Sequence, residues 1–230
     1  PSDYISQIDK EWTALPEGEL SPKMSALLNN PLADELKALE DYYEKKYGYK
    51  VIGEILVTNK YGALVAQTDR ATDYYQADEA WWQEAVKNDL FVEDVALDKS
   101  SGVRGVSICL KVKDREGNFA GVFKIVVSSE EFGHNLESVK AIFEAQISGQ
   151  INRNARYLEC DLFTRDGQII YSTEHHSPSE EIVHWDSFAK DLQASRGQPG
   201  YKIINSPAFY EKPLLFIYAQ SRGSGNYKGL

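Results

Sequence analysis

A run of aromatic and acidic side chains between residues 73 and 82 carries the strongest chemical signal in this sequence. The run reads Asp-Tyr-Tyr-Gln-Ala-Asp-Glu-Ala-Trp-Trp and holds two of the chain's four tryptophans. On a helix, Tyr74, Asp78 and Trp81 would share one face, with Trp82 beside it. Aromatic side chains carry large apolar areas that prefer burial, so this face must cover something. It covers either a hydrophobic core or a small-ligand pocket with aromatic walls and an orienting carboxylate.

Three polar residues farther along the chain would complete such a pocket. Lys124 interrupts an apolar run, so it either reaches solvent at the edge of a sheet or neutralises an acid. Asp98 precedes a Ser-Ser-Gly turn, where its carboxylate either caps the turn or accepts hydrogen bonds from a ligand. Ser107 belongs to a run in which apolar and polar residues alternate, so strand parity places the polar ones on one face.

These residues together define a predicted ligand site. The aromatic side chains would form apolar walls or stack on a cation or a ring. The carboxylates would accept hydrogen bonds, and the serine and the lysine would donate them. Such a mixed lining suits a small polar or zwitterionic metabolite better than a lipid. The predicted lining consists of Tyr74, Tyr75, Asp78, Trp81, Trp82, Asp98, Ser107 and Lys124.

The composition excludes several classes of partner. The chain has 230 residues, with 25 Lys and Arg against 35 Asp and Glu and a formal net charge of −10 at pH 7. Nucleic acid and anionic lipid both require a basic surface, so neither is expected as a partner. Hydrophobic residues make up 42% of the chain, which is enough for a substantial core. The sequence contains no apolar run of about 18 residues and no recognisable secretory signal.

Motifs for catalysis, metals and cofactors are missing from the sequence. No Ser-His-Asp order, phosphate loop or dinucleotide fingerprint occurs, so neither enzyme activity nor a cofactor is expected. His175 and His176 are adjacent on a strand-like run, so their side chains would diverge and are not expected to hold one metal ion. Cys109 and Cys160 could pair, but both lie in strand-like runs, which favours two buried thiols.

The elements that would position the site begin with helices and continue as strands. Two helical segments precede Gly48, and the second has Asn30 as a cap and Pro31 at its first position. A hairpin of strands covers residues 51–68, and the aromatic segment from about Thr72 to Asn88 is predicted to be a helix. An antiparallel meander follows, with strands at 91–97, 103–113 and 119–127.

The second half of the chain repeats this order in a shorter form. It contains a connecting helix from Leu136, a hairpin at 157–173, a helix at 179–195 and strands at 201–204 and 214–221. Both hairpins place Thr after an apolar residue, then a turn ending in Gly, as in Thr58…Gly62 and Thr164…Gly167. We therefore predict an α+β protein with helices at 1–50, a first module at 51–135 and a second module at 136–230.

This arrangement resembles the double Cache (double PDC) domain, the extracytoplasmic sensor of bacterial and archaeal histidine kinases and chemoreceptors. The resemblance covers nearly the whole chain. It is carried by Thr58…Gly62-Ala-Leu-Val-Ala-Gln-Thr68, the aromatic segment from Asp73 to Ala85, Asp98-Lys-Ser-Ser-Gly102, Asp114…Gly117…Gly121-Val122 and the final Tyr227-Lys-Gly-Leu230.

The resemblance implies two PAS-like modules with antiparallel central sheets, arranged along a long N-terminal helix. A membrane-distal first module would bind a small-molecule signal, and a membrane-proximal second module would transmit it to a histidine kinase or a similar output. The domain would lie in the periplasm or outside the cell, tethered by transmembrane helices that flank this chain. Two copies would pair as a parallel homodimer through their N-terminal helices.

One subfamily of these sensors binds amino acids through a signature that this chain matches only in part. Trp81 and Trp82 match its aromatic pair. Glu79 stands where the resemblance implies arginine, Leu97 where it implies tyrosine, and Val126 where it implies aspartate. The residues that would hold a carboxylate and an ammonium are missing, so α-amino acid binding of that type is not expected.

Two other functions fit the same residues. The chain could be a secreted binding or lectin-like module whose tryptophans stack on sugar rings. It could also be an interaction module without a ligand, in which both tryptophans belong to the core. Membrane spans on both sides of the domain would favour the sensor, and a secretory signal without a second span would favour the binding module. A structure without a ligand-sized pocket would favour the interaction module.

Overall fold

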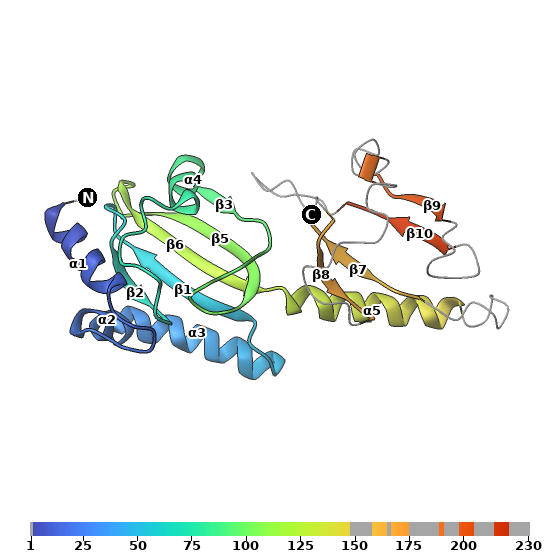
Figure 1. The fold of residues 1–230 in the computed structure, drawn as a ribbon, viewed down its shortest axis with the longest axis horizontal. Helices are drawn as coiled ribbons and strands as arrows, with labels where there is room; N and C mark the ends of the chain where they lie inside the picture. The colour runs from blue at the N-terminus through green and yellow to red at the C-terminus, as the bar shows by residue number, and fades with distance from the viewer. Residues whose placement is uncertain are drawn as a thin grey trace. The chain divides into compact units, whose positions relative to one another are not determined.

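The computed structural model describes residues 2–147, 158–164, 167–174, 189–190, 198–204 and 214–220. The chain divides into two compact units, Pro1–Phe132 and Gly133–Leu230 (Figure 1). Both units combine helices with antiparallel strand pairs, which confirms the predicted mixed α+β class. No helix among the described residues is both long and apolar enough to cross a lipid bilayer.

The first unit is built on one antiparallel sheet. Its strand order is β2-β1-β6-β5-β3, and the short β4 also pairs with β5. The predicted hairpin and meander are therefore present, but the single strand expected at 91–97 is split into β3 and β4. The strands are β1 (Ile52–Thr58), β2 (Leu64–Gln67), β3 (Leu90–Val92), β4 (Ala96–Leu97), β5 (Arg104–Lys113) and β6 (Phe119–Ser128).

Three helices precede this sheet, one more than the sequence predicted. They are α1 (Asp3–Thr13), α2 (Pro22–Leu28) and α3 (Pro31–Tyr47). The predicted caps of α3 are present, because the Asn30 side chain accepts a hydrogen bond from the Ala33 N–H and Gly48 ends the helix with a φ of 83°. The α2 segment is predicted to be a loop because it is short and lies in a stretch rich in Pro, Gly and Ser. In the structure it is a helix, and the Ser21 side chain caps its N-terminus. The longest of the three, α3, has 17 residues.

The two faces of the sheet are covered by different elements. On one face, Ala33 and Leu36 of α3 pack against Ile52, Ile55 and Ala66. On the opposite face, α1, α2 and α4 (Ala80–Asn88) form a second hydrophobic cluster over the strands. Figure 1 shows α4 above the sheet and α3 below it. We call the face beneath α4 the covered face.

The aromatic helix begins later than predicted. Residues 72–79 are not helical, and α4 begins only at Ala80. The backbone of this segment instead pairs with the β1–β2 hairpin: the Leu64 N–H donates to the Tyr74 carbonyl at 3.1 Å, and the Gln76 N–H donates to the Gly62 carbonyl at 2.8 Å. Gly62 has a φ of 79° and lies so close to Ala77 that a side chain would not fit. Because these partners are far away in sequence, helical spacing could not reveal them.

The second unit contains α5 and two strand pairs. Its strands β7 (Asp161–Phe163) and β8 (Ile169–Ser172) form one hairpin, and β9 (Gly200–Ile204) pairs with β10 (Leu214–Tyr218). α5 spans Glu130–Ile147 and begins at the end of the first unit. Most of the helix expected at 179–195, together with His175, His176 and His184, lies outside the described residues.

The repeated hairpin turns share one geometry. In the first unit, the Gly62 N–H donates to the Asn59 carbonyl and the Asn59 N–H donates to the Ala63 carbonyl. In the second, the Gly167 N–H donates to the Thr164 carbonyl, and the Thr164 N–H donates to the carbonyl of the residue after Gly167. Both glycines have a positive φ, of 79° and 89° respectively. One turn geometry is therefore used twice, with Gly167 equivalent to Gly62 but Thr164 equivalent to Asn59 rather than to Thr58.

The two cysteines are both free thiols. Cys109 is fully buried on the covered face of the first unit, as predicted. Cys160 is only half-buried, because it lies just before the short strand β7. Burial and the nearby Glu93 raise the pKa of the Cys109 thiol to about 12, so this sulfur stays protonated at neutral pH.

Candidate functional site

Lys124 is the centre of a charged cluster on the covered face. It lies in β6, between Leu56 of β1 and Cys109 of β5 in the sheet register. Residues directly opposite each other on paired strands point to the same face, so these three side chains share it. The Lys124 side chain is about 10% exposed. The sequence left open whether Lys124 reaches solvent or pairs with an acid, and the structure shows that it pairs with an acid.

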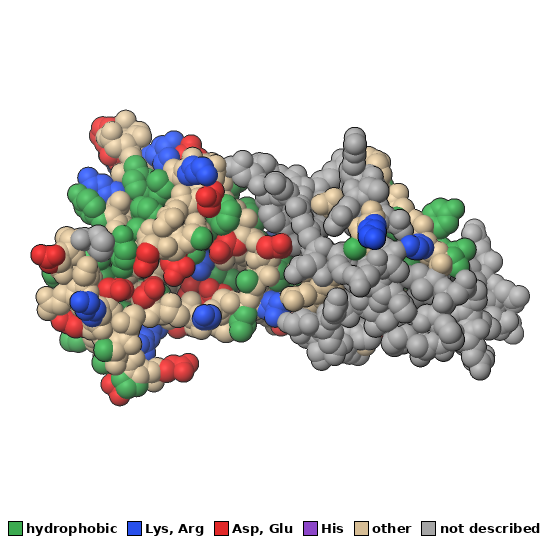
Figure 2. All heavy atoms as spheres, turned by 45° about the horizontal axis from the view of Figure 1, so that its top comes forward, with side chains coloured by type: hydrophobic (Ala, Val, Ile, Leu, Met, Phe, Trp, Pro, Cys, Tyr) green, Lys and Arg blue, Asp and Glu red, His purple; other side chains and the backbone are tan. Residues whose placement is uncertain are grey.

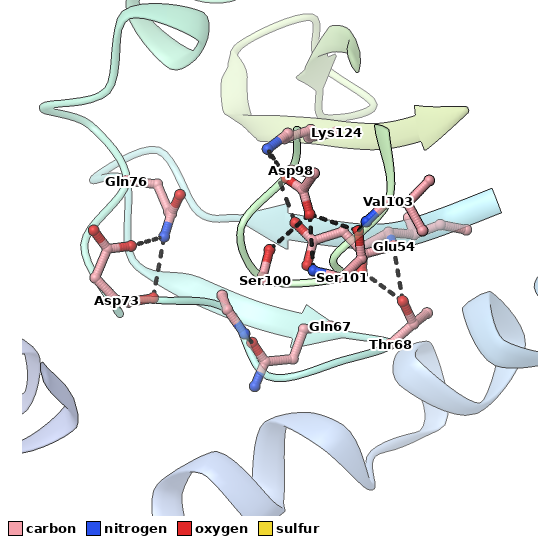
Figure 3. Close-up of polar contacts among 12 residues, drawn as sticks. Glu54, Gln67, Thr68, Asp73, Gln76, Asp98, Ser100, Ser101, Val103 and Lys124 are labelled. Atoms are coloured by element: carbon pink, nitrogen blue, oxygen red, sulfur yellow. Dashed lines mark hydrogen bonds and ion pairs between the residues drawn. The ribbon is translucent and has the colours of Figure 1, made fainter. Parts of the chain in front are cut away.

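Asp98 and Trp81 bring two further elements to Lys124. Lys124 Nζ lies 3.3 Å from Asp98 Oδ1 (Figure 3). It also lies 5.2 Å from the centre of the Trp81 ring. Trp81 stands on the first turn of α4 and is 5% exposed. The ammonium therefore contacts a carboxylate on one side and an aromatic face on the other, and both interactions strengthen when solvent is excluded.

The loop after β4 fixes the Asp98 carboxylate. Its Oδ2 accepts hydrogen bonds from the Ser100 hydroxyl at 2.9 Å, the Ser101 hydroxyl at 2.7 Å and the Ser101 N–H at 3.0 Å. The other oxygen, Oδ1, is left for Lys124. The capping role weighed for Asp98 in the sequence is therefore present on Oδ2, while Oδ1 pairs with Lys124.

Glu54 is a member of the cluster that sequence reasoning missed. It lies in β1 opposite Val126, and its Oε1 is 3.8 Å from Lys124 Nζ. Its side chain is only 2% exposed, and no hydrogen-bond partner for Oε1 is present among the described residues. Lys124 was identified as a charged residue inside an apolar strand. Glu54 shows the same pattern in the run Ile52–Val57, so this signal could have identified it too.

The electrostatics of the three charged residues differ from one another. Burial would raise the pKa of Asp98, but the Ser101 N–H and Lys124 outweigh it and hold that pKa below its ordinary value. Burial would lower the pKa of Lys124, but Glu54 and Asp98 raise it. For Glu54, burial and the nearby Asp98 raise the pKa to about 7 despite Lys124. At neutral pH the cluster therefore holds an ionised Lys124–Asp98 pair and a carboxyl group close to its titration point.

Acidic side chains are also frequent elsewhere in the first unit. Figure 2 shows acidic side chains across the middle of the first unit, with few basic ones among them. Asp73 is half-buried, and Gln76 donates a hydrogen bond to its carboxylate (Figure 3). Burial raises the pKa of Asp73 to about 7, and the neighbouring Glu79 and Asp9 add to the effect. An acidic surface of this kind favours the approach of a cation over that of an anion.

Ser107 shares the covered face but stands one step away from Lys124. It lies opposite Val126 in the register, whereas Cys109 is the residue directly opposite Lys124. Its side chain is buried. The predicted shared face of Ser107 and Cys109 is therefore confirmed, and the strand pairing places Ser107 beside Val126 and Cys109 beside Lys124.

Tyr74 and Asp78 lie away from the cluster. Tyr74 is buried in the hydrophobic core with its ring 5.7 Å from that of Trp12. Its N–H and that of Tyr75 both donate to the Asp9 carboxylate at 2.9 Å, which ties this segment to α1. Asp78 is exposed. The prediction that Tyr74 and Asp78 share a helical face with Trp81 is wrong, because residues 72–79 are not helical.

Tyr75 and Trp82 line a separate surface pocket of about 370 Å³. Trp82 donates through Nε1 to the Thr58 hydroxyl at 2.8 Å, and its ring makes a T-shaped contact with that of Phe119. Neither Lys124 nor Asp98 lines this pocket, which is open to solvent and lacks a buried charge. Its lining consists of Ser2, Ile5, Lys60, Tyr61, Tyr75, Ala77 and Trp82. We therefore take the charged cluster, rather than this pocket, as the candidate site.

The donor set of the cluster suits non-covalent recognition. A buried carboxylate, an ammonium and an aromatic face can hold a polar ligand through charge, hydrogen bonds and stacking. Within the part of the chain that the structure describes, no three His, Cys, Asp or Glu side chains are grouped so as to hold a metal ion.

Comparison with known proteins decides the fold. No family model matches the sequence, and no curated protein matches it. Among solved structures, the extracellular domain of rpHK1S-Z16, a protein named as a histidine kinase, aligns with a TM-score of 0.55 and 15% identity. That alignment covers 98% of this chain and 79% of the other. The chain therefore shares the fold of that extracellular domain, in agreement with the predicted fold.

Two further structures are similar to this chain. An extracellular ligand-binding receptor from Desulfohalobium retbaense DSM5692 aligns with a TM-score of 0.50 and 10% identity, over 93% of this chain and 36% of that one. The amino acid chemoreceptor PctC of Pseudomonas aeruginosa PAO1, solved with GABA, aligns with a TM-score of 0.49 and 13% identity, over 97% and 84% of the two chains.

Proposed function

We propose that this chain is the extracytoplasmic sensor domain of a membrane receptor and binds a small polar metabolite in its first unit. The observation that carries the proposal is the Lys124–Asp98–Glu54 cluster beneath Trp81. Burying charged groups costs free energy that an apolar core would avoid, and strongly perturbed pKa values cluster at functional sites, so this cluster is a candidate binding site. The double Cache fold supports a sensor, since both similar structures with the higher TM-scores are extracellular domains.

The lectin-like alternative has less support. A sugar-stacking platform needs exposed aromatic faces, and Trp81 is buried against Lys124 while Trp82 is half-buried and hydrogen-bonded to Thr58. The ligand-free alternative explains the burial of Trp81 but gives no reason for two carboxylates beneath it. A binding site accounts for both.

The test is a thermal-shift screen of this chain against small metabolites, followed by affinity measurements on variants. Asp98→Asn should weaken the ligand found in the screen by about ten- to a hundredfold, because a charge-assisted hydrogen bond is lost. Asp78→Asn is the matched control, since it makes the same chemical change at an exposed residue outside the cluster. If Asp98→Asn folds normally and binds the ligand as tightly as the wild type, the site lies elsewhere.

We also propose that membrane helices flanking this chain tether the domain and that the second unit passes the signal to a histidine kinase or a similar output. Pairing of two copies side by side through their N-terminal helices would give such a transmission path. In support, α3 presents exposed large apolar side chains that a partner copy could cover. They are Leu32, Leu39, Tyr42 and Tyr47.

Cross-linking in the full-length receptor checks this pairing. Tyr42→Cys, introduced with Cys109 and Cys160 changed to serine, should form a disulfide between two copies, because a residue on a parallel interface meets its own counterpart. Leu32→Cys mixed with Tyr47→Cys is the comparison, since these positions lie at opposite ends of α3. Cross-linking of the mixed pair in preference to Tyr42 with itself would indicate antiparallel helices and contradict the proposal.

A further inference from the structure

The Lys124 ammonium sits where a bound amine would be expected. Its Nζ contacts the Asp98 carboxylate and lies 3.8 Å from Glu54 Oε1 (Figure 3). It also lies over the Trp81 ring. A carboxylate and an aromatic face are the groups with which proteins recognise ammonium ligands. Here they close around the end of a side chain that comes from the sheet itself.

A lysine is an unusual residue for this position in the fold. β6 is an interior strand with β1 on one side and β5 on the other, and the residues flanking Lys124 in the register are Leu56 and Cys109. An apolar side chain would pack with these neighbours without the desolvation of a charge. The ammonium therefore neutralises the carboxylates and is not required for the packing of the sheet.

The carboxylates also offer more acceptors than Lys124 uses. Glu54 Oε1 is buried and lies beyond hydrogen-bond distance from Nζ, and no other donor reaches it among the described residues. A buried carboxylate oxygen without a donor costs free energy comparable to a lost hydrogen bond. A donor placed slightly differently from Nζ could bond to Glu54 and Asp98 together.

We propose that Trp81, Asp98 and Glu54 form an ammonium cage that the chain's own Lys124 fills, and that the ligand of the first unit is a primary amine that takes the place of the Lys124 ammonium. This inference rests on the proposed function and names the ligand class of the same site. The lysine side chain is a flexible four-carbon stem, so its charged end can leave while its backbone stays in β6.

The charge of the cage selects amines. Exchange of one ammonium for another leaves the charge beside Asp98 and Glu54 unchanged. A carboxylate ligand would add a third negative group to this buried place, and an uncharged ligand would leave both carboxylates without a cation. An amine is therefore the class of small molecule that this cage accepts at the lowest electrostatic cost.

Lys124→Ala provides the test, because it removes a three-carbon segment and the ammonium. Propylammonium is the missing fragment, and 1-propanol and propionate are its neutral and anionic counterparts. We expect propylammonium to bind Lys124→Ala at least tenfold more tightly than the wild type and to raise its melting temperature, while the two counterparts do neither. Adding Asp98→Asn or Glu54→Gln to Lys124→Ala should reduce propylammonium affinity at least tenfold.

Lys111→Ala is the matched control. Lys111 shares the strand face with Cys109 but pairs with the exposed Asp89 at 2.9 Å, so its removal should create no amine site. If the Lys124→Ala variant does not fold, the double variant Lys124→Ala with Glu54→Gln replaces it, because it has one buried carboxylate fewer. This double variant should still bind propylammonium in preference to propionate. The proposal is overturned if neither variant binds propylammonium, or if Asp98→Asn leaves that binding unchanged.

The failure of this inference is distinguishable from failure of the sensor proposal. A metabolite from the screen that is acidic or uncharged, yet depends on Asp98, would leave the sensor proposal standing and overturn the amine. Conversely, propylammonium binding to Lys124→Ala without any metabolite effect on the wild type would uphold the cage and contradict the sensing role of this unit.

Discussion

Replacing Lys124 with methionine should lower the free energy of unfolding by about 3–5 kcal/mol at pH 8. Methionine keeps much of the stem's packing, so the loss comes from the charge. Without the ammonium, Glu54 and Asp98 are two buried carboxylates with no cation close by. Urea denaturation of the wild type and the variant measures the difference directly.

The same variant should lose less at pH 5. The pKa of Glu54 is raised to about 7, so at pH 5 this carboxyl group is protonated and only Asp98 is left without its cation. Asp98 keeps its hydrogen bonds from Ser100 and Ser101, which partly compensate it. Lys111→Met, which breaks an exposed pair with Asp89, should cost less than about 1 kcal/mol at both pH values. An equal loss for both lysines would mean that the cluster is not electrostatically coupled.

Glu54→Gln should flatten the pH dependence of stability between about pH 4.5 and pH 7. The pKa of Glu54 in the folded state, about 7, lies above its ordinary value of 4.5. Between those two values the folded chain binds more protons than the unfolded chain, so the free energy of unfolding falls as pH rises. A difference of that size corresponds to roughly 3 kcal/mol at most, and coupling to Lys124 reduces it. The groups that act on Glu54 are Asp98, Lys124, Ser100 and Asp69.

Asp73→Asn is the comparison for this experiment. The pKa of Asp73 is also raised to about 7, so it contributes a fall in stability over a similar pH range from a different part of the unit. Each single variant should remove part of the fall, and the double variant should remove most of it. Urea denaturation at pH 5, 6, 7 and 8 gives the four curves. A Glu54→Gln curve parallel to that of the wild type would show that Glu54 titrates near its ordinary pKa.

Only part of the candidate site could be found from the sequence. Lys124, Asp98 and Trp81 were each singled out by a local signal: a charge in an apolar strand, an acid before a turn, and an aromatic pair on a helix. These three do meet in the structure. Tyr74, Asp78, Tyr75 and Trp82 were added to them by an assumed continuous helix, and the structure places all four away from Lys124.

The break in that helix depends on tertiary structure. The backbone groups of Tyr74 and Gln76 bond to Leu64 and Gly62, and Asp9 of α1 accepts the N–H groups of Tyr74 and Tyr75. Every buried backbone group needs a partner, and these partners come from α1 and the β1–β2 hairpin, which precede the segment in the sequence. A helical pattern in the sequence reports only on contacts about four residues apart. It therefore could not show that hydrogen bonds to distant segments would replace the helical ones.

The sequence by itself determined the α+β class, most strand boundaries of the first unit and the caps of α3. These features depend on alternation, turn residues and capping residues, all of which act within a few positions along the chain. The sheet register was decided only by the fold: it brings Glu54 and Lys124, which are on neighbouring strands but far apart in sequence, onto one face with Asp98. Whether a charged residue in an apolar strand meets solvent or a counter-charge is set by what lies across the sheet, because the free energy of a buried charge depends on its neighbours in space.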